Sequence, residues 1–182
     1  MKRRLFVTLI AAALAAIPAV GWAQGSKPTK IGVLVLGSPT PDLFLKELRQ
    51  GLESLGYVEG RNVRMEVRNA ENKSDRLNEL AAELVGDKVD VIVAFQTPAA
   101  LAAKRATSKI PIVMAPVGEA VGTGLVTSLA RPEGNVTGIS AAAAEIAGKT
   151  LELLRELKPT AQRIAVLANE ADGFTKPFVA QI

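Results

Sequence analysis

The chain has 182 residues, of which 22 are Lys or Arg and 18 are Asp or Glu, so its formal net charge is +4. It contains neither His nor Cys, which excludes a disulfide framework and removes the commonest metal ligand and neutral-pH general base. The small charge excludes the broad basic surface typical of a nucleic-acid partner.

The first residues have the features of a cleavable export signal. Basic residues at 2–4 precede an apolar stretch over 5–20, and small residues follow at positions 21 and 23. The stretch is shorter than the roughly 20 apolar residues of a membrane span. We therefore predict a signal peptide over residues 1–23, cleaved after Ala23, and a periplasmic mature chain. The arginine pair leaves the twin-arginine and general secretory routes both open.

From residue 29 onward, short apolar runs alternate with segments of helical periodicity, the pattern of a parallel sheet with connecting helices. We predict a strand over 30–36 and then a helix that presents leucines at 45, 48, 52 and 55 and stops at Gly56. A second strand over 62–68 alternates apolar and charged residues, which indicates a sheet edge. Its helix begins near Ser74 and ends at Gly86.

The third strand, over 89–95, is almost wholly apolar and suits a central position. Thr97 and Pro98 are predicted to open the next helix, with the Thr97 hydroxyl as its N-cap, and that helix runs to residue 106. The later elements are predicted in chain order as a strand, a short helix, a strand, a long helix and a strand, over 110–115, 125–130, 136–140, 141–157 and 163–168. Four residues of the long helix are expected to be buried, namely Ile146, Leu153, Leu154 and Leu157.

Ten of these segments together resemble the periplasmic substrate-binding proteins of an ABC-importer group that includes binders of tryptophan and related amino acids. They occupy residues 30–33, 50–52, 55–60, 75–77, 81–85, 89–93, 97–104, 110–113, 129–132 and 134–138. Each segment alone is an ordinary strand, cap or turn, so the resemblance depends on their combination and order.

The resemblance implies an α/β fold of the type I periplasmic binding class, in which each of two lobes is a three-layer parallel sheet with helices on both faces. We expect residues 29–140 to form the first lobe and residues 141–182 to begin a second lobe that is incomplete, so that the chain is a truncated one. The resemblance further implies a small-molecule ligand captured by hinge closure, and permease and ATPase subunits of an importer as partners. A secreted α/β sensory or structural domain that binds a partner protein is the alternative.

Ligands of open parallel sheets bind beyond the carboxyl ends of the strands, so the loops there contain the candidate ligand-binding residues. The candidates are Ser38, Gln96, Thr97, Glu119 and Ser140, with Asn169 from the second lobe. Thr97 and its helix N-terminus suit a carboxylate, Gln96 offers an amide, and Glu119 could pair with a ligand ammonium. Each candidate also has a purely structural interpretation, as a cap, a turn residue or a solvated side chain.

The sequence gives little support for an enzymatic function. The segment 138–142 lacks the final glycine of a nucleophile elbow, and a chain without His cannot form a Ser-His-Asp triad. The glycines at 118, 122 and 124 match neither a Walker loop nor a dinucleotide-binding fingerprint. We therefore predict a binding protein with no catalytic residues, no metal site and no cofactor.

Overall fold

Five parallel strands form one sheet in the order β2-β1-β3-β4-β5. The computed structural model describes residues 27–37, 41–169 and 172–180. Its strands are β1 (Thr29–Val35), β2 (Val63–Asn69), β3 (Val91–Phe95), β4 (Ile112–Val117) and β5 (Val136–Ser140). The edge position predicted for the second strand and the central position predicted for the third are both confirmed.

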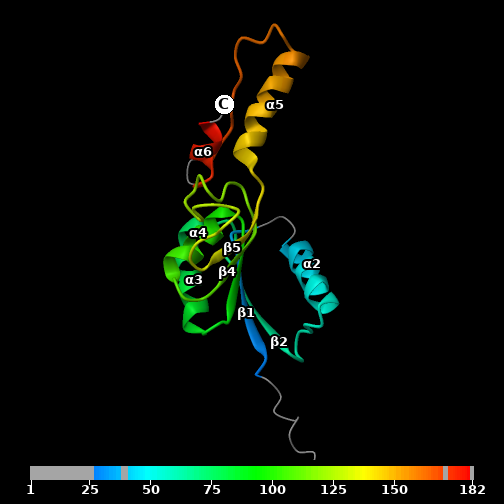
Figure 1. Ribbon diagram of the computed structural model, residues 1–182, viewed down its shortest axis with the longest axis vertical. Helices are drawn as coiled ribbons and strands as arrows, with labels where there is room; N and C mark the ends of the chain where they lie inside the picture. Colours follow the sequence, from blue (N-terminus) through cyan, green and yellow to red (C-terminus); the bar gives the residue numbers. More distant parts are fainter. Residues whose placement is uncertain (1–26, 38–40, 170–171, 181–182) are drawn as a thin grey trace, which may run out of the picture.

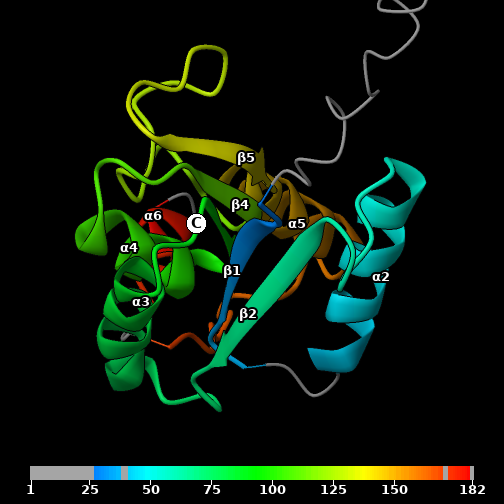
Figure 2. The ribbon, with the colours of Figure 1, turned by 90° about the horizontal axis from the view of Figure 1, so that it is seen from below.

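Helices cover both faces of this sheet, as Figure 2 shows. Helix α2 (Pro41–Ser54) lies on one face, whereas α3 (Leu77–Gly86), preceded by the short helix η1 (Ser74–Arg76), and α4 (Thr97–Ala106) lie on the other. Helices α5 (Ala143–Leu157) and α6 (Thr175–Val179) lie beyond the carboxyl ends of the strands (Figure 1). The predicted three-layer α/β fold is therefore confirmed for the part of the chain that the structure describes.

The alternation of side chains along β1 divides the core into two halves. Val33 and Val35 face α2, where they form one apolar cluster with partly buried leucines of that helix. Leu34 points to the other face and is buried with Leu84 of α3 and Ile92 of β3. Both faces of the central strands are therefore shielded from water, which explains their nearly continuous apolar sequence.

An irregularity between β4 and β5 shapes the carboxyl end of the sheet. The two strands pair in register from Ile112 with Val136 to Met114 with Gly138, and the register then shifts so that Val117 pairs with Ser140. Pro116 lies within the shift, where its missing N–H group removes no regular ladder bond. The shift places the residues that follow β4 beside the end of β5.

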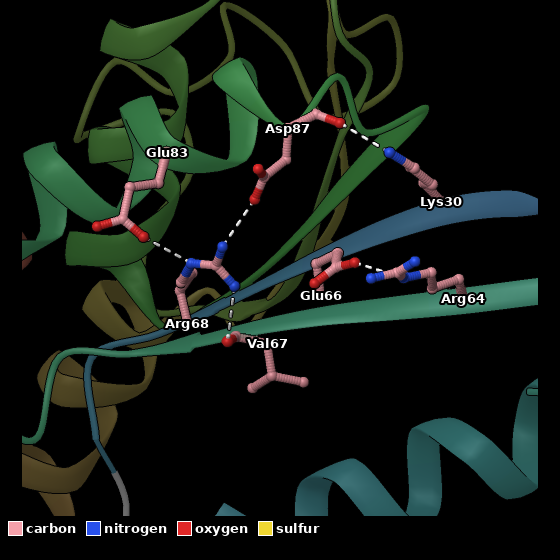
Figure 3. Close-up of polar contacts among 7 residues, drawn as sticks. All are labelled: Lys30, Arg64, Glu66, Val67, Arg68, Glu83 and Asp87. Atoms are coloured by element: carbon pink, nitrogen blue, oxygen red, sulfur yellow. Dashed lines mark hydrogen bonds and ion pairs between the residues drawn. The ribbon is translucent and has the colours of Figure 1, made fainter.

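On the face covered by α3, the outer strand β2 is polar and is joined to the helix by ion pairs (Figure 3). The guanidinium of Arg68 donates to Glu83 Oε2 and to Asp87 Oδ2, both at 2.7 Å. Lys30 Nζ donates to the backbone oxygen of Asp87 at 3.1 Å. These contacts connect β1, β2 and the end of α3 at an edge where apolar burial is incomplete.

Three sequence predictions are wrong in the region after β4. Residues 125–130 form no helix, although Leu125 and Val126 are buried. On α5, the residues expected to be buried are exposed, with Ile146 at 59% and Leu157 at 80%, and with Leu153 and Leu154 at 49% and 44%. Residues 163–168 form no strand. The second and third errors have a common reason. No described strand pairs with residues 163–168, and residues 164–167 and Phe178 lie against the apolar face of α5 without filling the space beside it, so the apolar pattern remains unsatisfied.

Candidate functional site

The carboxyl ends of β1 and β3 form the candidate site, because the chain leaves these neighbouring strands toward opposite faces. The connection after β1 leads to α2 on one face, and the connection after β3 leads to α4 on the other (Figure 2). In such sheets, diverging connections mark the usual ligand position between two adjacent strands, and we call this position the crevice. Gln96 directly follows β3 at this crevice.

Gln96 has a strained backbone and an unpaired side-chain atom. Its φ of 75° and ψ of 157° lie in a region that is almost exclusive to glycine. Its backbone N–H donates to Pro116 O at 3.2 Å. The side-chain Oε1 is buried, and no described residue donates a hydrogen bond to it. A buried acceptor without a protein donor can accept a hydrogen bond from a ligand or a water molecule, which makes Gln96 the strongest of the predicted site residues.

The cap assignment of Thr97 is wrong. The N-cap of α4 is Gln96, which makes no side-chain capping bond, and Thr97 is the first residue of the helix. The Thr97 side chain is buried, and its Oγ1 accepts a hydrogen bond from the N–H of Gly118 at 3.0 Å. The positive φ of Gln96 moves the helix start back by one residue, so the hydroxyl joins α4 to the loop after β4 instead of capping the helix.

The remaining predicted residues lie around the same edge or beyond it. Ser140 is half-buried at the end of β5, and its Oγ accepts from the N–H of Ala120 at 3.2 Å. Glu119 is half-buried in the loop after β4, and its carboxylate pairs with no cation of the described residues. Asn169 is exposed, and its backbone oxygen accepts from Asp172 N–H at 3.1 Å. Ser38 lies outside the described residues.

Sequence reasoning missed Phe174, which lies against the loop after β4. A Cβ atom at Gly118 would lie 2.6 Å from Cδ2 of the Phe174 ring, so the ring rests directly on the glycine backbone. The only signal in the sequence is that Phe174 is one of five phenylalanines and follows a glycine. Periodicity cannot show that two loops more than fifty residues apart meet.

A cavity near the later residues lies away from the strand ends. It has a volume of about 410 Å³ and is bounded by α5, residues 164–167 and Phe178. Its lining is mainly apolar, and it opens along the exposed face of α5.

Elsewhere on α5, the hydrogen bond from Lys149 lowers the pKa of Glu152, but this exposed pair is outside the crevice.

Within the described ranges, no group of three or more acidic residues is placed to hold a metal ion. None of the helices in those ranges is both long enough and apolar enough to cross a bilayer. The chemistry available at the crevice is therefore hydrogen bonding by Gln96, Thr97 and backbone groups, with one carboxylate, Glu119, in the neighbouring loop.

Comparison with known proteins gives consistent matches. A family model described as ABC transporter substrate binding protein matches residues 30–180. The tyrosine-binding protein of Clostridioides difficile (strain R20291) is 40% identical over 154 residues, which are 84% of this chain and 44% of that protein.

Solved structures also match this chain over most of its length. An ABC domain from Streptococcus pneumoniae in complex with L-Trp has a TM-score of 0.72 and 32% identity, over 83% of this chain and 50% of that one. A conserved domain protein from Vibrio cholerae has a TM-score of 0.74 and 31% identity, over 85% of this chain and 52% of that one. The chain thus spans about half the length of the relatives it matches.

Proposed function

Because this chain belongs to the ABC transporter substrate-binding protein family, we propose that it forms part of the solute-binding component of an ABC importer. In this proposal, residues 29–140 form one wall of a cleft, and residues 141–182 begin the opposite wall. Hinge closure buries a small molecule between the walls, and the permease and ATPase subunits respond to the closed form. Residues 1–23 act as the export signal that delivers the protein to the periplasm.

The observation that carries the proposal is the buried, unpaired Oε1 of Gln96 at the crevice between β1 and β3. Leaving such an acceptor without a donor costs about 1–3 kcal/mol, which a ligand N–H or O–H group would recover. Ser38, Thr97, Glu119, Ser140 and Asn169 are proposed to border the same cleft.

We propose an amino acid with an aromatic side chain as the ligand. This choice is supported by the names of two relatives, one a tyrosine-binding protein and one solved with L-Trp. An α-ammonium group is a suitable donor for Gln96 Oε1, and Glu119 lies in the adjacent loop to complement its charge. A carboxylate would face the N-terminal N–H groups of α4.

The test is a titration of the isotope-labelled chain with L-tryptophan and L-phenylalanine, followed by amide chemical shifts. A single wall leaves much of the ligand in water, so we expect weak binding, on the order of 1 mM. The shift changes should be confined to residues near Gln96, Gly118 and Ser140. Glycine, which supplies the ammonium and carboxylate without a ring, is the matched control ligand.

Two outcomes would refute the proposal. One is the absence of any saturable shift change with either aromatic amino acid. The other is a set of changes that maps to α5 and the cavity beside it and leaves the strand ends unaffected. The second outcome would favour the alternative function, a domain whose exposed apolar face binds a partner protein.

A further inference from the structure

Residues 172–177 fold back onto the loop after β4 at Gly118 and Gly122 and onto helix α4 at Leu101, and at each of these three places a glycine permits close approach. A Cβ at Gly118 would lie 2.6 Å from Cδ2 and 2.9 Å from Cε2 of the Phe174 ring. A Cβ at Gly122 would lie 2.9 Å from Cβ of Pro177, and a Cβ at Gly173 would lie 2.9 Å from Leu101 Cδ1. The contact at Gly118 involves a stiff ring, so it tolerates an added methyl group least.

The turn before α6 fixes the position of Phe174. Asp172 Oδ1 accepts the backbone N–H of Phe174 at 3.0 Å, and the N–H of Thr175 donates to the backbone oxygen of Asp172 at 2.9 Å. The Thr175 hydroxyl donates to Asn169 O at 2.5 Å. The Phe178 ring packs against Phe174 from α6, with centroids 5.3 Å apart and planes tilted by 54°. Backbone, side chain and aromatic contacts therefore hold one ring direction.

This ring lies at the same edge as the strongest predicted site residue. Gly118, on which the ring rests, donates its N–H to Thr97 Oγ1 at 3.0 Å, and Thr97 directly follows Gln96. Phe174 as a residue is half-buried, so part of it is accessible for a further contact. The edge thus combines an unpaired acceptor with a fixed, partly open aromatic surface.

We propose that Phe174 is a ligand-contacting residue that selects for a flat apolar ring, and that Gly118 is the positioning residue that holds it. The inference rests on the proposed function and deepens it by assigning the residue that distinguishes aromatic from aliphatic ligands. Offset or tilted ring pairs add attraction beyond the apolar area that they bury.

The first experiment compares the wild-type chain with Phe174→Leu by the same titration, using L-phenylalanine and L-leucine as probes. Loss of the ring contact should weaken binding of L-phenylalanine roughly two- to tenfold while changing that of L-leucine by less than about twofold. A merely structural role would weaken both ligands equally and would overturn the inference. Tighter binding by the variant would also overturn it, because Phe174 would then obstruct the cleft.

The second experiment tests the positioning residue. Gly118→Ala should displace the ring and reproduce the selectivity change, whereas Gly86→Ala should not, because a Cβ at Gly86 meets nothing within 4 Å. Amide hydrogen exchange of residues 172–179 should accelerate in Gly118→Ala alone, independently of any ligand. Unchanged exchange and selectivity would refute the role of Gly118.

The failure of this inference is distinguishable from failure of the proposed function. If the wild-type chain binds neither probe, the proposed function and the inference both fall. If it binds L-phenylalanine and Phe174→Leu binds it equally well, the inference alone falls.

Discussion

Replacing Gln96 by glycine should stabilise the fold. Gln96 combines two unfavourable features, a backbone conformation with φ of 75° and ψ of 157°, and a buried side-chain oxygen without a donor among the described residues. Glycine adopts this conformation without steric strain and removes the unpaired oxygen. A residue whose replacement improves stability at a ligand crevice is retained for a reason other than folding.

The magnitude follows from comparing Gln96→Gly with Gln96→Ala. Both variants remove the unpaired oxygen, but only glycine relieves the backbone strain, which costs a residue with a Cβ about 1–3 kcal/mol. Glycine loses more backbone entropy on folding, which offsets about 0.5–1 kcal/mol. The mid-range values of these two effects make Gln96→Gly more stable than Gln96→Ala by about 1 kcal/mol.

Urea unfolding followed by circular dichroism measures this difference. The midpoint should move to higher urea in Gln96→Gly with an unchanged slope, because the surface exposed on unfolding is nearly the same. Both variants should lose shift changes on titration with L-tryptophan. The reasoning is refuted if Gln96→Gly unfolds at the same or lower urea than Gln96→Ala, since the strain would then contribute nothing.

Three further predictions concern the rest of the fold. Arg68→Met should lower the free energy of unfolding by about 0.5–1.5 kcal/mol, because the 2.7 Å ion pairs of Arg68 with Glu83 and Asp87 are partly exposed. Urea unfolding should show a smaller loss at high salt, and an equal loss at low and high salt would exclude an ionic origin. Ile92→Ala should lower it by about 2–5 kcal/mol, since Ile92 is fully buried in the central strand, and a loss below about 1 kcal/mol in the same assay would contradict that placement. Leu154→Lys should reduce binding of a hydrophobic dye, because Leu154 is 44% exposed and lines the cavity beside α5. The free energy of unfolding should change by no more than about 0.5 kcal/mol. Unchanged dye binding would show that this face of α5 is covered.

The elements that sequence patterns predicted correctly are those whose partners lie within the described sheet. The alternation of Val63, Met65 and Val67 with charged residues places β2 at an edge, and the apolar run of β3 places it in the centre. Both predictions are confirmed because each pattern is satisfied by neighbouring strands and by α2, α3 and α4. Gly56, with a φ of 85°, also ends the first helix region as predicted.

The same patterns fail where the expected partner is not among the described residues. The apolar spacing of Ile146 and Leu154 is correct for a helix, and α5 is a helix, but residues 164–167 and Phe178 leave a cavity beside those side chains instead of burying them. The apolar run at 163–168 likewise has no neighbouring strand to pair with. Pattern reasoning assigns a residue to a buried face, whereas burial itself depends on a second surface.

Around the candidate site, the sequence predicted where Gln96 and Thr97 lie in the fold but not their local geometry. That Gln96 and Thr97 end a central strand is readable from the chain, and the structure brings them to the crevice with the loop after β4. Gln96 takes the N-cap position that was predicted for Thr97, because the φ angle of Gln96 is positive. No conformational propensity of glutamine would predict this angle. The meeting of Gly118 and Phe174 is a tertiary contact with no local signature.

The distribution of backbone strain separates the two ends of the sheet. Among the residues that the structure describes, five that are not glycine have positive φ, and four of them, Glu71, Asn72, Gln96 and Ala142, follow the carboxyl ends of strands. Only Lys88 precedes a strand. Strained residues persist where the surrounding structure over-determines them, and they concentrate at functional sites. The sheet and its two apolar clusters supply the stability that offsets this strain, so substitutions that relax the carboxyl edge should stabilise the chain while weakening its contact with a ligand. A substitution that relaxes the backbone of Lys88, at the opposite edge of the sheet, should stabilise the chain without changing ligand binding. This difference between the two edges would show that the strain at the carboxyl edge serves ligand binding.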